Sequence, residues 1–484
     1  MGFLFLKTMY LFEHDNTYYA YSFLKNTLLK INSEAYRDAK RNEQTDRLQN
    51  LMKTWTKMGF FKEDLTAAVK LHLPQLQFSF SPVHECNMRC KYCFADHGKK
   101  YKGIEREITK EMVDRILDFV FWGQFQSFTD YRIDFVSGGE PLLNFDIIHY
   151  TIEQSKKLLE NTNKRLSIFL VTNGTINNPE IFEYLDKNNV NIGISIDGDS
   201  VTHNNNRRFA DGSPSYKTVI NTINSIRESS SSSSRIKDLW GLSVITSESK
   251  NLAGIIEHHK ALQIKHMQME LVRACKDLPF SINERNLTSL ISEYAELTNY
   301  FLNEIRNGRL DSLKMILNDN DYFGKILCRI IDGGRMYYRC TAGIGKFNFD
   351  ASGNIFPCEF LAGDPRYCVG NIDSGINEGA ITQYFEEHVD KRPLCNACWA
   401  RYICGGDCYS NSLLVNNNIY LPDECFCKVN KSIIEFALIL VFAMKEKGIY
   451  DACKKFVHMR KVLSTVGGYE SSIENKPQAV DATK

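Results

Sequence analysis

The chain has 484 residues, of which 43% are hydrophobic and 24% are charged, the composition of an ordinary globular protein. Its length predicts roughly two to four domains. Lysine and arginine number 59 against 58 aspartates and glutamates, which leaves a formal charge of +1. This balance argues against a protein that binds nucleic acid or an anionic membrane surface through a basic patch.

Eleven of the 15 cysteines are spaced as metal ligands rather than as a disulfide framework. The first apolar stretch, Met1–Phe12, is interrupted by Lys7, and no small-residue cleavage site follows it. The strongest apolar run, Ile433–Met444, contains Glu435 and is too short to span a bilayer, so it predicts a buried helix. We therefore expect a cytoplasmic protein with reduced thiols.

Residues 1–72 are predicted to form a separate small unit. Three strand-like stretches come first, and two polar helical stretches follow them. The strands are Phe3–Phe12, Tyr18–Phe23 and Leu28–Ile31, and the helices are Ser33–Gln49 and Leu51–Met58.

Residues 76–275 alternate strands with helical stretches. Six such repeats predict an α/β fold, a parallel sheet curled into a partial (β/α)6 TIM-like barrel. Ligands of such a barrel bind at the carboxyl ends of its strands. The predicted strands are Leu76–Ser81, Tyr131–Val136, Leu166–Val171, Val190–Ile196, Leu239–Ile245 and His266–Val272.

The remaining chain divides by composition. Residues 276–335 are predicted to be a helical connector, and residues 336–430 are cysteine-rich with little periodicity. Residues 431–484 are predicted to hold a C-terminal helix and a disordered tail, and Ser229–Ser234 to be a surface loop.

Three cysteines, Cys86, Cys90 and Cys93, lie in one short loop after the first predicted strand. A structural zinc or an electron-carrying cluster normally has four protein ligands. Three thiolates would leave one iron of a cluster open for chemistry. The alternative is a zinc site completed by a distant residue such as His84 or His97.

Polar motifs follow the next strands. Gly138-Gly139-Glu140 ends the second, and its glycines allow close backbone approach while its carboxylate can accept from an ammonium. Thr172-Asn173-Gly174-Thr175 ends the third strand, and Ser195-Ile196-Asp197-Gly198 ends the fourth. Each alone predicts a turn, but together they indicate a site.

A second cysteine pattern lies in the C-terminal part of the chain. Its spacing suits larger clusters, and a zinc ribbon is the structural alternative. Cys395, Cys398, Cys404 and Cys408 form C-x2-C-x5-C-x3-C, Cys340 and Cys358 lie upstream around Gly353, and Cys425 and Cys427 lie downstream.

The sequence CNMRCKYC resembles the CxxxCxxC motif of radical S-adenosylmethionine (radical SAM) enzymes, with Tyr92 as the usual aromatic residue. GGEP, TNGT and SIDGD…HNNNRR resemble later motifs of that family over residues 76–275. The resemblance implies a [4Fe–4S] cluster held by Cys86, Cys90 and Cys93, with S-adenosyl-L-methionine (SAM) chelating the open iron. An electron from the cluster would then break the sulfonium bond and yield a 5′-deoxyadenosyl radical.

The same resemblance implies cofactor-binding residues. Glu140 and the backbone of Gly138 and Gly139 would hold the SAM amino group. Ser195 and Arg207 are candidates for the SAM carboxylate, and the adjacent Arg208 is an alternative to Arg207.

The second pattern resembles the SPASM domain of peptide- and protein-modifying radical SAM enzymes, which holds two auxiliary [4Fe–4S] clusters. By that resemblance, Cys340, Cys358 and Cys408 ligate the first. Cys395, Cys398, Cys404 and either Cys425 or Cys427 ligate the second, and the flanking residues favour Cys427.

The fourth ligand of the first auxiliary cluster is left open. Some relatives have a cysteine where this chain has Gly334, and Cys328 or Cys425 could substitute. Otherwise one iron is open to a substrate thiolate. Glu359 matches a proposed catalytic base of sulfatase-maturing enzymes, and a solvent-facing glutamate is the alternative.

Residues 1–72 resemble the winged-helix leader-recognition domain of peptide-modifying enzymes, which adds a leader peptide as a strand to a sheet edge. A barrel extension without a ligand is the alternative. We therefore expect a radical SAM peptide maturase that forms a thioether or carbon–carbon crosslink, with a precursor peptide and a ferredoxin or flavodoxin as partners. The alternatives are an anaerobic sulfatase-maturing enzyme, which makes formylglycine, and a non-catalytic iron–sulfur electron-transfer protein.

Overall fold

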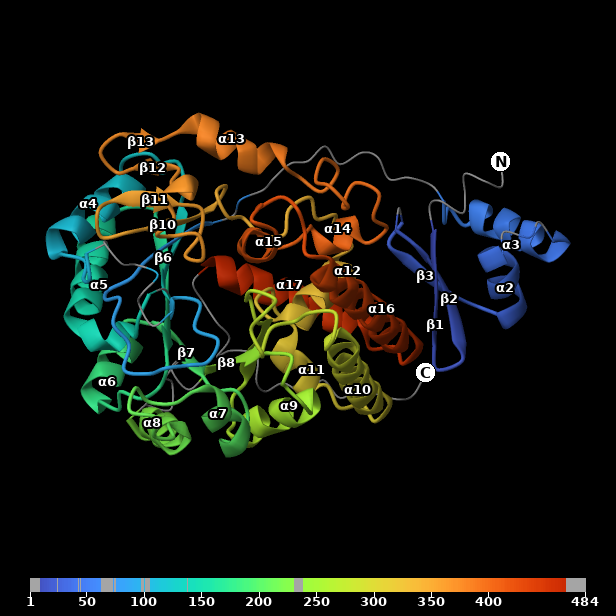
Figure 1. Cartoon of the computed structure of the whole chain (residues 1–484), viewed down its shortest axis with the longest axis horizontal. Coiled ribbons are helices and arrows are strands. Elements are labelled where there is room, and N and C mark those ends of the chain that lie inside the picture. Colours follow the sequence, from blue (N-terminus) through green and yellow to red (C-terminus); the bar gives the residue numbers. More distant parts are fainter. Residues whose placement is uncertain are drawn as a thin grey trace, which may run out of the picture.

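The computed structural model describes residues 9–61 apart from 24, 42 and 44, then residues 73, 75–96 and 100, residues 105–229 apart from 137, and residues 238–466. His97, the serines from position 230 and the tail from 467 lie outside these residues. The described chain forms a three-stranded sheet at one end and a ten-stranded sheet at the other, with C-terminal helices between them (Figure 1).

Six parallel strands lie side by side in chain order in the large sheet, and the last of them forms one edge of the sheet in the described part of the chain. This confirms the predicted partial barrel, and each strand ends within one residue of its predicted bounds. The strands are β4 (Leu76–Phe80), β5 (Asp130–Phe135), β6 (Arg165–Thr172), β7 (Asn191–Ser195), β8 (Trp240–Ile245) and β9 (His266–Leu271).

Amphipathic helices cover the outer face of these strands (Figure 1). In α4 (Lys110–Phe121), Val113, Ile116, Leu117 and Val120 are fully buried, the spacing of a helix with one apolar face. The other covering helices are α5 (Phe145–Leu159), α6 (Pro179–Lys187), α8 (Tyr216–Ser229) and α9 (Leu252–Ala261).

Four further strands extend the sheet beyond β4. β10 (Lys346–Phe349) pairs in parallel with β4, and Phe347 lies opposite Phe78. The cysteine-rich region is thereby joined to the first barrel strand, which no local sequence pattern predicted. The remaining strands, all antiparallel, are β11 (Asn354–Phe356), β12 (Gly370–Asn371) and β13 (Gly375–Ile376).

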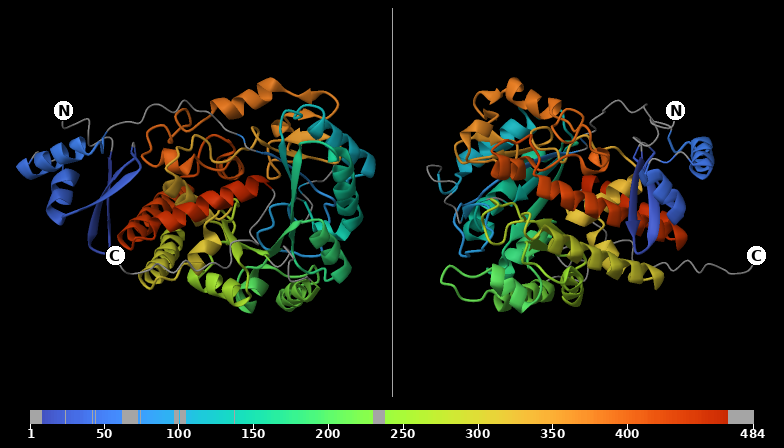
Figure 2. Two further views of the ribbon diagram at one scale, coloured as in Figure 1. Left: turned by 180° about the vertical axis from the view of Figure 1, so that it is seen from behind. Right: turned by 45° about the vertical axis from the view of Figure 1, so that its right-hand side comes forward.

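The N-terminal unit contains β1 (Met9–His14), β2 (Thr17–Ser22) and β3 (Thr27–Ile31) in an antiparallel sheet. Two helices, α2 (Ser33–Arg41) and α3 (Asp46–Lys57), cover its outer face (Figure 2). The predicted helix boundary near residue 50 was wrong, because the hydroxyl of Thr45 accepts from Leu48 N at 3.2 Å and starts α3 there.

Helices α10 (Leu287–Arg306), α12 (Tyr322–Asp332), α16 (Glu424–Glu446) and α17 (Tyr450–Val466) occupy the space between the two sheets (Figure 1). The predicted buried helix at Ile433–Met444 lies within α16, which already begins at Glu424. Within the described residues, no helix is long and apolar enough to cross a membrane.

Asp321 joins α12 to the last barrel strand. Its buried carboxylate accepts from Gly324 N at 2.6 Å and from Met269 N in β9 at 2.8 Å. Asp321→Ala should lower the free energy of unfolding by about 2–3 kcal/mol, since a helix cap and a buried donor lose their acceptor. Chemical unfolding measures this, with Asp311→Ala at exposed Asp311 of α11 (Asp311–Ile316) as the near-neutral control. Equal stability of the two variants would contradict the assignment.

Candidate active site and auxiliary cysteine groups

The loop of residues 86–93, called the cluster loop below, follows β4 and carries Cys86, Cys90 and Cys93. The segment of residues 206–210 runs beside it and pairs with it through backbone hydrogen bonds. These bonds join Arg89 N to Arg208 O (2.8 Å), Lys91 N to Asn206 O (3.0 Å) and Ala210 N to Asn87 O (2.9 Å). The HNNNRR motif therefore supports the backbone of the cluster loop.

The three thiols of the cluster loop are electrostatic neighbours. Burial raises the pKa of Cys90 to about 12, Arg207 opposes that rise, and the Cys93 and Cys86 thiols add to it. Burial likewise raises the pKa of Cys86. Such crowding favours neutral thiols, whereas bound iron would favour thiolates. Among the residues that the structure describes, no group of three or more Cys, His, Asp and Glu side chains is arranged to hold a metal ion.

Glu140 lies just before the helix-like turn at Pro141–Asn144 and joins three strand ends. Its N–H donates to Glu85 O at 2.8 Å. Its carboxylate, 2% exposed, accepts from Thr172 Oγ1 and Asn173 N, both at 2.7 Å, and from Leu142 N at 3.2 Å. Burial raises the pKa of Glu140 to about 7, and these hydrogen bonds oppose that rise. A carboxylate has about four acceptor positions, so one remains for a further donor such as an ammonium group.

The two glycines before Glu140 are required by their surroundings. Gly138 has φ +90°, and a Cβ there would lie 2.5 Å from His84 Nδ1. At Gly139 a Cβ would lie 2.0 Å from Glu85 O. His84, the candidate zinc ligand, thus packs against this glycine turn.

The turn after β6 also contacts the cluster loop. Asn173 Nδ2 donates to Asn87 Oδ1 at 2.9 Å and lies 3.8 Å from Cys86 Sγ. Thr175 Oγ1 accepts from Asn87 Nδ2 at 2.8 Å. The TNGT motif therefore holds one end of the cluster loop.

Asp197, after β7, has the densest set of contacts in the site. Its carboxylate, 1% exposed, accepts from the Tyr92 hydroxyl, from Asn206 Nδ2 at 3.1 Å, from Arg207 Nε at 3.2 Å and from Val244 N at 3.1 Å. The Arg207 guanidinium lies over the Tyr92 ring, with its central carbon 5.3 Å from the ring centroid. Asp197 thereby orients the aromatic residue of the cluster loop and the candidate arginine together.

The candidates for the SAM carboxylate differ in position. Ser195, the last residue of β7, and Arg207 are both buried at this edge of the sheet. Arg208 is exposed, and its guanidinium donates to Gly212 O at 3.0 Å. The geometry favours Arg207 over Arg208.

Cys340, Cys358 and Cys408, called the first auxiliary group, also lie together. Burial raises the pKa of Cys358, and Glu359, Cys408 and Cys340 add to that rise, while Lys346 opposes it. Arg273, just after β9, hydrogen-bonds the Cys408 thiol. Cys328, the suggested fourth ligand, is buried in the apolar core around α12 and α16.

Glu359 is buried, so the solvent-facing alternative was wrong. Its Oε1 accepts from Lys346 Nζ in β10 at 3.0 Å. Burial would raise the pKa of Glu359, but Lys346 and other donors hold it below its ordinary value. Lys100 Nζ donates to the neighbouring Phe360 O at 2.7 Å. The carboxylate is therefore held charged beside Cys358.

Cys395, Cys398, Cys404 and Cys427 form a second auxiliary group. Burial raises the pKa of Cys427, and the thiols of Cys404, Cys395 and Cys398, together with Asp407, raise it further. The CxxC loop, the short helix α14 (Arg401–Cys404) and the first turn of α16 therefore bring these four thiols together.

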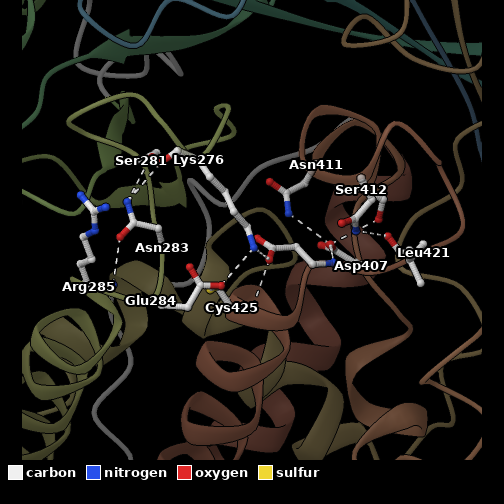
Figure 3. A network of polar contacts seen from close by, with 12 residues as sticks. Lys276, Ser281, Asn283, Glu284, Arg285, Asp407, Asn411, Ser412, Leu421 and Cys425 are labelled. Atoms are coloured by element: carbon white, nitrogen blue, oxygen red, sulfur yellow. Dashed lines mark hydrogen bonds and ion pairs between the residues drawn. The ribbon is translucent and has the colours of Figure 1, made fainter.

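Cys425 has a different environment from Cys427. Its thiol donates to Glu284 Oε1 at 3.2 Å, in a network that also contains Lys276 (Figure 3). Burial raises the pKa of Cys425 to about 11, and Glu284 adds to that rise. Of the two alternatives, the arrangement favours Cys427 as the fourth member of the second auxiliary group.

Asp407 lies in the polar network of Figure 3 and contacts chain segments that carry cysteines of both auxiliary groups. Its Oδ1 accepts from Cys408 N at 2.7 Å, and its Oδ2 accepts from Asp423 N, at the start of α16, at 2.9 Å. Lys276 Nζ lies 3.4 Å from Asp423 Oδ1. The loop after β9 is thereby joined to both auxiliary groups.

Residues 80–239 match the Radical SAM superfamily, so the chain contains a radical SAM domain, as its motifs predicted. The chain is 24% identical over 367 residues to the cysteine-type anaerobic sulfatase-maturating enzyme of Clostridium perfringens (strain 13 / Type A), covering 69% of this chain and 89% of that protein. It is 24% identical over 373 residues to the radical SAM cyclopropyl synthase TigE of Paramaledivibacter caminithermalis, covering 72% of this chain and 71% of that protein.

Solved structures share the fold. Native anSMEcpe with bound AdoMet superposes with a TM-score of 0.62 at 19% identity and covers 77% of this chain and 99% of its own. Streptococcus suis SuiB bound to precursor peptide SuiA superposes with a TM-score of 0.50 at 14% identity, over 87% of this chain and 98% of its own.

Three residues of the site had no assigned role from sequence. Asp197 stood within a quoted motif, and its position at a strand end was the available signal. No sequence motif marks Arg273 or Lys346. Arg273 follows β9 and Lys346 begins β10, and each comes near the cysteines only because segments distant in the chain pack together.

Gly139→Ala should strongly weaken SAM binding to the cluster-loaded protein, because its Cβ would push the Glu140 turn away from Glu85 O. A weakening of at least roughly 100-fold is expected, since an overpacked backbone displaces the ligand's partners. Equilibrium binding of radiolabelled SAM measures it. Gly334→Ala, with no atom within 4 Å of its Cβ, is the matched control. Unchanged binding in Gly139→Ala would contradict this role for the glycine turn.

Proposed function

We propose that the chain is a radical SAM maturase that crosslinks a ribosomally synthesised precursor peptide, through a thioether or a carbon–carbon bond. The observation that carries this proposal is the joining of a small strand-and-helix unit to a radical SAM barrel with two auxiliary cysteine groups. SuiB, which shares the fold, was solved with a precursor peptide bound.

We assign three [4Fe–4S] clusters to these three groups of cysteines, and SAM to the residues around the cluster loop. The cluster loop offers three neighbouring thiols, and the carboxylate of Glu140 has acceptor capacity left for an amino group. The second auxiliary group offers four thiols, and the first offers three. When bound, the cluster and SAM supply hydrogen-atom abstraction from an unactivated carbon, a reaction outside the reach of side chains.

In this proposal the residues around the cluster loop hold the two ends of the amino acid portion of SAM. Glu140 and the glycine turn hold its amino group, and Ser195 and Arg207 hold its carboxylate. Asp197 accepts hydrogen bonds from both Arg207 and Tyr92 and so holds the two side chains in place relative to each other. Glu359 accepts the proton that the substrate loses, and Lys346 keeps it oriented. A ferredoxin or flavodoxin would supply the electron that starts the reaction, and the auxiliary clusters would take up the electron that the substrate radical releases when the new bond forms.

The N-terminal sheet supplies the proposed leader site. β1 and β3 are its two outer strands in the part of the chain that the structure describes. A strand edge presents backbone donors and acceptors to which an extended peptide can pair. A leader bound there would hold the core peptide near the barrel and raise its effective concentration.

A sulfatase-maturing activity is the second candidate. It is favoured by the buried Glu359 beside Cys358 and by the likeness to the sulfatase-maturating relative. Both activities remove hydrogen from a peptide residue, so the products separate them. A crosslink resists carbonyl reagents, whereas formylglycine is an aldehyde that reacts with a hydrazide.

The test incubates the reconstituted chain, SAM and a reductant with short peptides encoded beside its gene, and with a sulfatase peptide. Loss of two hydrogens without hydrazide reactivity, seen by mass spectrometry, supports the crosslink. A hydrazide-reactive product of the sulfatase peptide supports the second candidate and overturns the first. Glu359→Gln should reduce product formation roughly 100-fold, the usual contribution of a general base. Unchanged product formation in Glu359→Gln would remove this residue from the mechanism.

Cys427→Ser should lower the iron content by roughly four per chain, the content of one [4Fe–4S] cluster. Cys425→Ser should retain the iron, because its thiol faces Glu284 rather than the other cysteines. Anaerobic iron and sulfide assays of the two variants provide the comparison. Iron loss in Cys425→Ser alone would reverse the assignment.

A further inference from the structure

Tyr10 of β1 reaches from the N-terminal unit to the second auxiliary group. Its ring stacks on Trp399 with centroids 3.8 Å apart and planes 10° apart. Trp399 directly follows Cys398. The Tyr10 hydroxyl donates to Glu435 Oε1 in α16 at 2.6 Å. One side chain therefore contacts both the CxxC loop and α16, the two elements that carry three of the four thiols.

Other aromatic residues of the same sheet face continue this contact. Phe12, Tyr19 and Tyr21 are buried in the apolar core that contains α12 and α16, and Cys398, Trp399 and Cys404 pack against that core. Tyr21 lies edge-on to Trp399 with centroids 6.2 Å apart. Figures 1 and 2 place the sheet directly beside α16 in every view. The N-terminal sheet is therefore one wall of the space around these cysteines.

The hydroxyl of Tyr10 is partly buried and is hydrogen-bonded to Glu435. Burial raises the pKa of Tyr10, with Glu435 as the next cause and the charge of Cys398 as a smaller one. Glu435 interrupts an otherwise apolar helix stretch. Burying its carboxyl group is unfavourable without a partner, so the hydrogen bond from Tyr10 favours a single docked position of the sheet on α16.

We propose that Tyr10 is a positioning residue of the second auxiliary group, which shields its cluster from water and holds the Cys398 loop in place. The inference rests on the proposed function in one respect, that these four cysteines hold a [4Fe–4S] cluster. Reduction adds negative charge to a cluster, and an apolar wall disfavours that charge. Removal of the wall admits water and makes the cluster easier to reduce.

The test compares variants of the full-length, anaerobically reconstituted chain. In Tyr10→Leu and Trp399→Leu, one ring of the stack is lost. Tyr10→Phe keeps the ring. Tyr18→Leu is the matched control, because Tyr18 lies on the opposite face of the sheet, against Tyr36 in α2 with centroids 4.8 Å apart. Midpoint potentials are followed by electron paramagnetic resonance, and iron is assayed in each variant.

One auxiliary cluster should become easier to reduce in both leucine variants of the stack. A tenfold change in the reduction equilibrium is expected, which is about 59 mV for a one-electron couple. Tyr10→Phe and Tyr18→Leu should retain the wild-type potential. A role in folding alone would lower stability in Tyr10→Leu without moving a potential.

The outcomes separate this inference from the function on which it rests. Wild-type protein with far fewer than about twelve irons would contradict the three-cluster assignment itself. Full iron with the same potential in wild type, Tyr10→Leu and Trp399→Leu would overturn the role of Tyr10. If Tyr10→Leu does not fold, Trp399→Leu decides, because it removes the other ring of the same stack.

Discussion

The buried carboxylate of Glu140 joins three consecutive strand ends. Its backbone N–H pairs with Glu85 at the start of the cluster loop, and its side chain accepts from Thr172 and Asn173 after β6. The Asp197 carboxylate likewise joins three segments, because it accepts from Tyr92 in the cluster loop, from Arg207 and from Val244 in β8. Glu140, through its backbone and side chain, and the Asp197 carboxylate thus hold the cluster loop and the residue before it against the ends of the parallel strands. The rest of the site depends on that alignment.

Sequence patterns predicted the parts of the fold with strong local signals. The six barrel strands are apolar runs bounded by turn residues, so their ends lay within one residue of the prediction. The motifs at those ends were also recognised as one site, because parallel strands bring their carboxyl ends together. The second and third N-terminal strands followed from the same kind of signal. The first predicted strand, Phe3–Phe12, ended too early, because β1 runs to His14, and its residues 3–8 lie outside the described part of the chain.

Contacts between distant segments were beyond local patterns. The pairing of β10 with β4 joins residues far apart in the chain, and it brings Lys346 to Glu359. The stacking of Tyr10 on Trp399 likewise depends on how a whole sheet docks on α16. Sequence left Cys425 and Cys427 both open, with the flanking residues in favour of Cys427. The first turn of α16 separates them, because the Cys425 thiol donates to Glu284. Burial of Glu359 had no sequence signal either.

The N-terminal unit therefore has two roles in this account, a strand edge for a peptide and a wall beside the second auxiliary group. Deletion of residues 1–72 would remove both at once, so it would not isolate peptide recognition. Point variants on the two faces of the sheet separate these roles. Because the same sheet contacts Trp399 beside Cys398, peptide binding at the sheet edge could change the surroundings of the second auxiliary group.

The central claim is that the cluster loop and the surrounding strand ends form a SAM-cleaving site. The most direct measurement is 5′-deoxyadenosine formation and iron content in the anaerobically reconstituted full chain. The account predicts about twelve irons per chain, with deoxyadenosine formed on reduction and lost in Cys90→Ala. Zinc in place of iron, or reduced iron-loaded protein that leaves SAM intact, would contradict it.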